Sequence, residues 1–144
     1  MNDAWNLERF VAAQAPLMDD VLAELRAGRK RTHWMWFVFP QLQGLGTSPM
    51  AHRFGIASLA EARAYLAHPV LGPRLRQCCE AMLQVPQRSA LEILGSPDDL
   101  KFRSCVTLFG LAAPQDDLFR RCLDRFHAGQ PDPRTLALCG TMDG

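Results

Sequence analysis

Apolar residues recur every three or four positions along most of the chain, the spacing that places them on one face of an α-helix. The clearest stretches run over 17–25, 59–66, 71–82, 102–109 and 118–126. Short links separate them, so successive helices follow one another closely. The pattern predicts an all-α fold, a single-domain irregular bundle of about seven helices over residues 1–144.

Residues with specific roles at helix ends mark several boundaries. Gly28 follows the stretch 17–25 and is expected to end that helix, because glycine readily adopts the left-handed backbone found there. Ser58, with Glu61 three residues later, has the spacing of a capping box and predicts a helix start. The run Ser96-Pro97-Asp98-Asp99 predicts another start, with a cap residue, a proline and first-turn acids.

One segment is ambiguous. Thr32–Phe39 is apolar on every side, so periodicity does not separate a buried helix from a buried strand. Thr32 as an N-cap and Pro40 as a stop favour a short helix. Residues 41–57 are expected to form a loop, because they are punctuated by turn-forming residues: Gly44, Gly46, Pro49 and Gly55. The tail beyond residue 131 is expected to form a short helical turn, and a small strand pair stays open.

Composition excludes several classes of function. Apolar residues make up 48% of the chain and charged residues 22%, as in a globular protein rather than a disordered one. The net charge is +1, so no overall field draws the chain to nucleic acid or to an anionic membrane. No apolar run approaches the roughly 20 residues of a membrane-spanning helix. We therefore expect neither a nucleic-acid groove nor a membrane segment.

The cysteines point to a reducing compartment. There are five of them, an odd number, with no C-x-x-C pair. They lie in apolar stretches, which favours reduced thiols over a disulfide framework. No histidine pair has metal-ligand spacing with them, and the N-terminus lacks the apolar run of a signal peptide. We expect a cytoplasmic protein without a metal site or cofactor.

Aromatic residues give a first candidate for a binding site. His33, Trp34 and Trp36 precede a glycine-containing segment that begins near Gln41. Two indole rings and a histidine beside such a segment are able to line a pocket in which a planar ring stacks. The alternative is that both tryptophans belong to the core, as large aromatic residues usually do.

A second candidate lies at the start of the helix that follows Pro97. Asp99, Lys101 and Arg103 bring an acid and two cations into its first turns. A helix N-terminus beside lysine and arginine is able to hold a phosphate group. The alternative is ordinary capping together with a surface ion pair between Asp99 and Arg103.

A third candidate is the first helical stretch, which carries Glu8 and Gln14. A carboxylate beside a pocket is able to act as a general base or to stabilise a cationic sugar in a transition state. The alternative is an exposed glutamate on an amphipathic helix.

Long runs of the chain closely resemble the uncharacterised bacterial family numbered 1810 among the domains of unknown function. The matching segments are 8–14, 28–42, 64–75, 97–101 and 104–109, and together they span most of the chain. The resemblance implies an all-α fold. It implies no activity, because none is assigned to the family.

A more distant resemblance concerns the NADAR proteins, which act on N-glycosidic bonds of the ADP-ribose type. Glu8-x-Phe10-x-x-Ala13-Gln14 is similar to their E-x-Y-x-x-A-Q helix, and Ser96-Pro97-x-Asp99 to their S-P-x-D turn. This likeness implies that Glu8 is the catalytic carboxylate, that Gln14 orients the ligand and that Asp99 is a second acid. The chain departs from that pattern at Ala15, where those proteins have lysine, and at Phe102-Arg103, where they have W-G.

Together these observations lead to a functional hypothesis: hydrolysis of an N-glycosidic bond in a nucleotide or ADP-ribose derivative. Glu8 and Asp99 are the predicted catalytic residues. The predicted ligand-binding residues are Gln14, His33, Trp34, Trp36, Gln41, Lys101 and Arg103. The alternative is a non-enzymatic domain that binds a nucleotide-like ligand or a partner protein. The hydrolase hypothesis requires these residues to converge on one concave site.

Overall fold

The computed structural model describes the backbone of residues 3–142 and the side chains of residues 3–140. These residues form ten helices and no strand: α1 (Glu8–Gln14), α2 (Met18–Arg26), α3 (Met35–Val38), α4 (Pro49–Phe54), α5 (Leu59–Ala67), α6 (Leu71–Gln84), α7 (Ala90–Leu94), α8 (Asp98–Ala112), α9 (Leu118–His127) and α10 (Pro133–Met142). The predicted all-α single domain is confirmed, and the expected number of helices was too low. None of the ten helices is long and apolar enough to cross a membrane.

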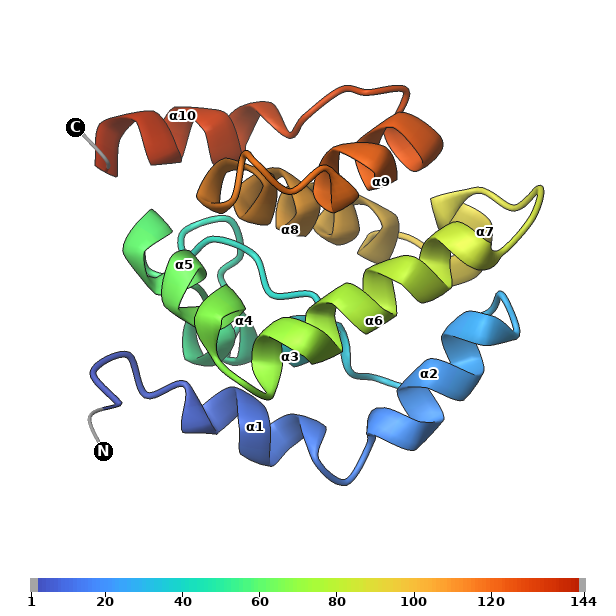
Figure 1. Ribbon diagram of the computed structural model, residues 1–144, viewed down its shortest axis with the longest axis horizontal. Coiled ribbons are helices and arrows are strands. Elements are labelled where there is room, and N and C mark those ends of the chain that lie inside the picture. The colour runs from blue at the N-terminus through green and yellow to red at the C-terminus, as the bar shows by residue number, and fades with distance from the viewer. Residues whose placement is uncertain (1–2, 143–144) are drawn as a thin grey trace.

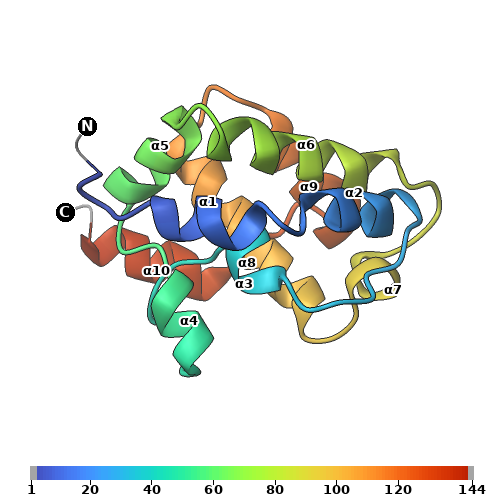
Figure 2. The same cartoon turned by 90° about the horizontal axis from the view of Figure 1, so that it is seen from below.

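Helix α8 forms the centre of the bundle. It packs against α5, α7, α9 and α10, and its consecutive residues 104–109 are all buried. In Figure 1, α9 and α10 cover the upper side of α8, while α1 and α2 lie along the opposite, lower edge of the molecule. Figure 2 shows the same arrangement from below, with α8 behind α1 and α3. The middle of α8 is enclosed and therefore needs apolar or hydrogen-bonded residues around its whole circumference, whereas its two ends reach the surface, where Leu100 and Leu111 are exposed.

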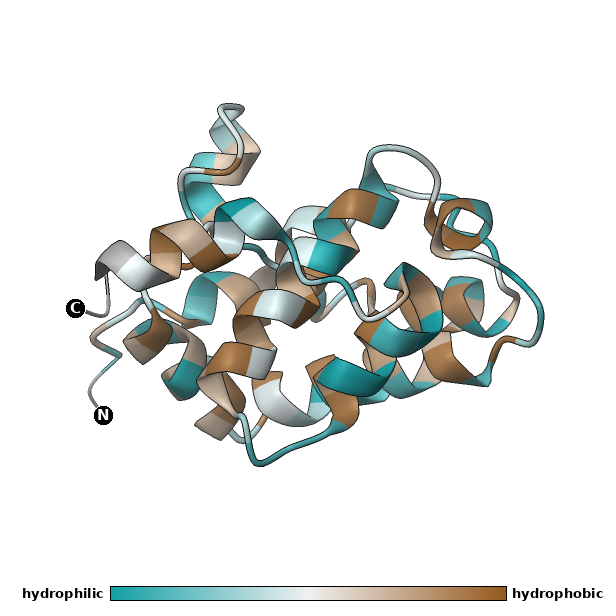
Figure 3. Ribbon diagram, turned by 90° about the horizontal axis from the view of Figure 1, so that it is seen from above, coloured by the Kyte–Doolittle hydropathy of each residue, from teal (hydrophilic) through white to brown (hydrophobic). Residues whose placement is uncertain are grey.

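Aromatic rings connect the layers of the core. Phe10 of α1 meets Tyr65 of α5 edge to face, with ring centroids 5.2 Å apart. Tyr65 in turn lies 5.2 Å from Phe109 of α8, which lies 6.0 Å from Phe119 of α9. These spacings fall in the favourable range for aromatic pairs. On the outer helices, hydrophobic and hydrophilic residues alternate along the ribbon, as one buried face requires (Figure 3).

Two predicted helix ends are formed largely as expected. Gly28 has a φ of +75°. Its N–H donates to the backbone carbonyl of Leu25, and the N–H of Arg29 donates to the backbone carbonyl of Glu24, so these two bonds end α2. The Ser58 hydroxyl accepts the N–H of Glu61 at 3.2 Å, as in a capping box. The Glu61 carboxylate does not complete that box.

The segment between residues 32 and 57 differs most from expectation. Its helix α3 is one turn long and is preceded by Trp34, not capped by Thr32. The expected loop contains α4, whose cap is Ser48 with Pro49 at the first helical position. Six residues are too few for periodicity to reveal, so only this start signal could have shown α4. The tail likewise forms a ten-residue helix, α10, instead of a short turn.

The possible strand pair is not formed within the described residues. They contain one isolated parallel bridge, between Leu42 and Ile56. The N–H of Gln43 donates to Ile56 at 2.8 Å, and the N–H of Ile56 donates to Gln41 at 3.0 Å. These two bonds close the loop between α3 and α5 at its base. They fix the backbone of Gln41 against the core residue Ile56.

Arg9 of α1 anchors the same loop from the other side. Its Nε donates to the carbonyl of Arg53 at 2.8 Å, and its Nη2 donates to the carbonyl of Gly55 at 3.0 Å. Nη2 also lies 2.9 Å from a carboxylate oxygen of Glu61, whose side chain is 2% exposed. The Nη1 atom donates to two carbonyls before α1. All five N–H groups of the guanidinium are therefore hydrogen-bonded.

We expect Arg9→Met to lower the free energy of unfolding by about 3 kcal/mol or more, because it leaves Glu61 buried without its cation. Urea unfolding followed by circular dichroism measures the change. Arg63→Gln, at an exposed position on α5, is the matched control and changes stability by less than about 0.5 kcal/mol. An Arg9→Met protein as stable as this control would contradict the anchoring role of Arg9.

Candidate functional site

A hollow of about 390 Å³ lies where the start of α8, the start of α10 and the loop after α3 meet. Three of its side chains are cationic, and we call it the cationic hollow. Its lining residues are Gln41, Leu45, Gly46, Pro97, Leu100, Lys101, Arg103, Ser104, Asp132 and Arg134. Three of the predicted ligand-binding residues, Gln41, Lys101 and Arg103, therefore come together here.

Lys101 brings a positive charge that is only partly neutralised. Its amino group lies 3.5 Å from Asp98, one turn earlier on α8, and 5.1 Å from the ring centre of Trp36. Asp98 is shared, because Lys30 lies closer to it, at 3.0 Å. One carboxylate thus serves two ammonium groups. The surplus charge leaves Lys101 able to hold an anion.

Arg103 is oriented by neutral partners. Its Nε donates to the carbonyl of Gln130 at 2.7 Å, and its Nη2 donates to the carbonyl of Pro131 at 3.0 Å. A guanidinium has five N–H groups, so further donors remain available. Among the residues that the structure describes, no ion pair joins Arg103 to Asp99. Its full charge therefore acts on the hollow.

Sequence reasoning missed two residues of the hollow, Asp132 and Arg134. Asp132 accepts both the N–H and the hydroxyl of Thr135, at 2.9 and 2.6 Å, so its carboxylate caps the first turn of α10. Arg134 donates to the carbonyl of Gly44 at 3.5 Å. The signal was the aspartate followed by proline at 132–133, a helix start in a tail that was expected to hold a single turn.

Trp36 lies beside the hollow rather than in it. Its half-buried ring lines a crevice of about 10 Å³ together with Gln41 and Lys101. A space of that size holds at most one water molecule, so no planar ligand stacks there. The contribution of Trp36 is the surface against which the Lys101 ammonium rests, a cation–π contact.

Glu8 lines a different hollow, of about 570 Å³, at the N-terminal end of the bundle. The other lining residues are Asp3, Ala4, Trp5, Leu7, Ala64, Ala67 and His68. The structure therefore does not bring Glu8 together with Lys101 and Arg103. The indole beside Glu8 belongs to Trp5, whose position near the N-terminus gave no helical pattern to place it.

Two other predicted ligand-binding residues are enclosed in the core. Gln14 is 1% exposed and donates to the carbonyl of Phe37 at 2.6 Å and to the Tyr65 hydroxyl at 3.0 Å. Trp34 is also 1% exposed. A ligand would reach either side chain only after the core had opened. His33, between them in sequence, is exposed and lies outside the cationic hollow.

Glu24 of α2 fixes the segment that carries Trp34. Its carboxylate accepts the backbone N–H groups of Arg31 and Thr32, the Thr32 hydroxyl at 2.6 Å and the Trp34 indole N–H at 3.0 Å. Burial alone would raise the pKa of this carboxyl. The four hydrogen bonds outweigh that effect and lower the pKa of Glu24 to about 2.

Asp99, the second predicted acid, lies in the first turn of α8 and interacts with His127 at the end of α9 rather than lining the hollow. One of its carboxylate oxygens is buried with no hydrogen-bond partner among the described residues, and so is Nε2 of His127. Burial lowers the pKa of His127, with the Arg103 charge adding to the effect and Asp99 opposing it. Asp99 does not line the hollow that contains Lys101.

Four of the five thiols lie near one another in the core, where Cys79 and Cys122 share a hydrogen bond and Cys78 and Cys105 are close by. All five cysteines are buried, and Cys78, Cys79, Cys105 and Cys122 are free of disulfide bonds. Burial raises the pKa of Cys78 to about 12, so this thiol stays protonated at neutral pH. Within residues 3–142 no cluster of three or more histidine, cysteine, aspartate or glutamate side chains is arranged to hold a metal ion.

Comparison with known proteins identifies the family of the chain. A profile described as "Protein of unknown function (DUF1810)" matches residues 4–139. The chain belongs to the DUF1810 family. The chain is similar to the conserved hypothetical protein Rv1873 from Mycobacterium tuberculosis, whose crystal structure is known. The two sequences are 55% identical, and the structures superimpose with a TM-score of 0.95 over 96% of this chain and 99% of that one. No curated protein matches the chain.

The resemblance to DUF1810 is thereby confirmed, together with the helical fold that it implied. The likeness to the NADAR proteins stays a prediction, as do the catalytic roles of Glu8 and Asp99.

The low pKa of Glu24 predicts an acid-labile contribution to stability. Because the pKa in the folded state lies below the value of 4.5 expected without these contacts, the contribution is complete above pH 4.5 and declines as the pH falls towards 2. We expect Glu24→Gln to lower the Tm by about 4–8 °C at pH 7, since it weakens hydrogen bonds to a charged group. Thermal unfolding between pH 7 and pH 2.5 should show this difference shrinking. A difference that is constant over that range would contradict the assignment.

Proposed function

We propose that the protein binds a phosphate-bearing small molecule of the nucleotide type in the cationic hollow. One observation carries the proposal: Lys101, Arg103 and Arg134 line one concavity of about 390 Å³. Known ligand pockets range over about 300–1,000 Å³. Among the described residues that line the hollow, Asp132 is the only acidic one, so the three cations outnumber it; one of its carboxylate oxygens accepts both hydrogen bonds from Thr135.

The cations differ in how they would hold a phosphate. Arg103 is fixed by two carbonyl groups, so little side-chain entropy is lost when it binds an anion. Lys101 is supported by the Trp36 ring. Arg134 is exposed and is held by one long hydrogen bond, so it is free to turn towards a ligand. Charge-assisted hydrogen bonds from such groups are about twice as strong as neutral ones.

The remaining lining residues suit the rest of a nucleotide. Leu45, Pro97 and Leu100 are apolar, and Leu100 is 53% exposed. An exposed leucine beside a cationic concavity offers apolar contact to a base or a ribose. The Gln41 amide supplies both a donor and an acceptor at the same rim.

Hydrolysis of an N-glycosidic bond is the more specific part of the hypothesis, and the geometry supports it less. Such a reaction places carboxyl groups beside the sugar that develops positive charge. Glu8 lines the other hollow, and the Asp132 side chain is held against α10, where one of its oxygens caps the helix. Binding without turnover is therefore the function that we propose, with hydrolysis as the alternative that experiment separates from it.

Titration calorimetry with AMP and ADP-ribose tests the binding site. Lys101→Gln and Arg134→Gln should each weaken binding by about tenfold, which corresponds to one charge-assisted hydrogen bond of about 1.4 kcal/mol. Arg29→Gln removes the same charge at an exposed position outside the hollow and should leave the affinity unchanged. Adenosine, which lacks phosphate, should bind much more weakly than AMP. Equal affinities for AMP and adenosine would refute a phosphate site.

Product analysis separates binding from hydrolysis. After incubation with ADP-ribose or NAD, we expect chromatography to recover the ligand unchanged, because Glu8 does not reach the cationic hollow. Glu8→Gln should bind these ligands as tightly as the unmodified protein does. Release of a free base that disappears in Glu8→Gln would reverse the assignment in favour of a glycosidase.

A further inference from the structure

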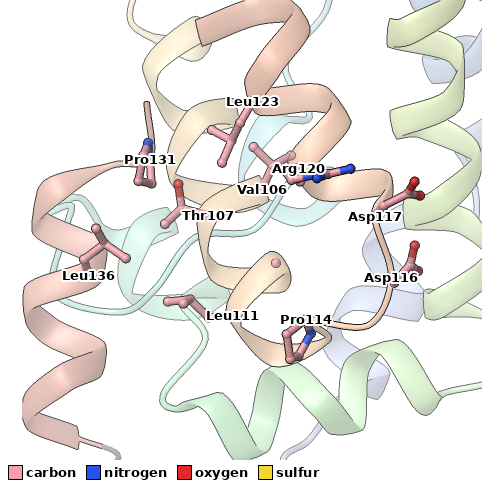
Figure 4. Close-up of a pocket in the computed structure, with 11 residues that line it drawn as sticks. Val106, Thr107, Leu111, Pro114, Asp116, Asp117, Arg120, Leu123, Pro131 and Leu136 are labelled. Carbon is pink, nitrogen blue, oxygen red and sulfur yellow. The ribbon is translucent and has the colours of Figure 1, made fainter. Parts of the chain in front are cut away.

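A second concavity, of about 450 Å³, lies between α8, α9 and α10 (Figure 4). We call it the apolar pocket. Its lining residues are Val106, Thr107, Gly110, Leu111, Pro114, Asp116, Asp117, Arg120, Leu123, Pro131 and Leu136. It shares none of them with the cationic hollow, so what it binds does not depend on the function proposed above.

The floor of the pocket offers no free hydrogen-bonding group. Val106 and Leu123 are buried apolar residues. The one buried hydroxyl, that of Thr107, donates to the carbonyl of Arg103 at 2.8 Å and accepts the N–H of Asp132 at 2.9 Å. A polar ligand would lose its hydration here and gain no partner in return. The body of the ligand must therefore be apolar.

Exposed leucines form the walls. Leu111 of α8 is 36% exposed and Leu136 of α10 is 41% exposed. In Figure 4, apolar side chains from α8, α9 and α10 gather at one end of the pocket, while Asp116 and Asp117 lie at the other. Apolar surface left open beside a concavity is the usual sign of a binding site.

Arg120 provides a charged group at the rim. Its exposed guanidinium has no hydrogen bond or ion pair with any residue in the described part of the chain. Asp116 does not compete for it, because this carboxylate pairs with Arg76 and accepts the N–H of Leu118. Asp117, three residues before Arg120, has no such partner. Its negative charge opposes an anion at this rim and moderates the affinity.

From these features we propose that the apolar pocket binds a small molecule with an apolar body and a single carboxylate, such as a medium-chain fatty acid. The chain would lie on Val106, Leu111 and Leu136, and the carboxylate would meet Arg120. The planar fork of a guanidinium matches a carboxylate with two parallel hydrogen bonds. The volume of about 450 Å³ suits a small molecule.

Titration calorimetry with decanoate, decanol and decylamine tests the proposal on the full chain. We expect decanoate to bind most tightly, decanol more weakly and decylamine most weakly. Arg120→Gln should weaken decanoate binding by about tenfold and leave decanol binding unchanged. Arg121→Gln is the matched control: this neighbour lies 3.8 Å from Glu80, does not line the pocket and should leave decanoate binding unchanged.

Two further variants test the apolar wall and the sign of the charge. Leu136→Ser, at an exposed position on α10, should weaken decanoate and decanol to the same extent, by about threefold or more. Asp117→Asn should strengthen decanoate binding, because it removes a like charge from the rim. Tighter binding of decylamine than of decanoate, lost in Asp117→Asn, would instead indicate a ligand with an ammonium group and would overturn the carboxylate assignment. Absence of decanoate binding at millimolar concentration would overturn the site altogether.

Discussion

The buried ion pair between Arg9 and Glu61 is the interaction on which the arrangement of the N-terminal half depends. Removing two charges from water costs more than their attraction returns unless every remaining donor and acceptor finds a partner. Here the guanidinium uses all five of its N–H groups, and the second oxygen of Glu61 accepts the N–H of Ala57 at 2.8 Å. Because the partners lie before α1, at the end of α4 and on α5, these bonds are satisfied together in only one arrangement of those elements.

That constraint extends to the cationic hollow. Arg9 holds the carbonyls of Arg53 and Gly55, and the bridge at Ile56 holds Gln41 directly opposite. The loop between them is thereby closed at its base, and its glycine-containing side faces the start of α8. The cations of α8 come from a helix whose other faces are buried against α5, α7 and α9. A rigid helix and an anchored loop are the kind of support that keeps a binding site in place before a ligand arrives.

The sequence revealed what is local and missed what depends on contacts between distant residues. Amphipathic periodicity located the long helices, and Gly28 marked the end of α2, because both signals lie within a few residues of the structure that they determine. The sequence also placed Lys101 and Arg103 in the first turns of one helix. Nothing local distinguishes Arg9 from an exposed arginine, since its partner Glu61 lies 52 positions away. The size of Trp34 did indicate the core as the alternative to a binding site, and the structure bears that alternative out, but its hydrogen bond to Glu24 depends on a contact between α2 and the segment after it.

The start of α10 separates the two concavities and forms a wall of each. Asp132 and Arg134 face the cationic hollow, whereas Pro131 and Leu136 line the apolar pocket. Thr107 links this wall to α8, because its hydroxyl joins the carbonyl of Arg103 to the N–H of Asp132. A ligand that displaced α10 from either side would therefore act on the same hydrogen bonds and on the same arginine. Coupling between two binding sites is reciprocal by thermodynamic necessity. If a ligand in the apolar pocket changes the affinity of the cationic hollow by some factor, then a ligand in the hollow changes the affinity of the pocket by the same factor.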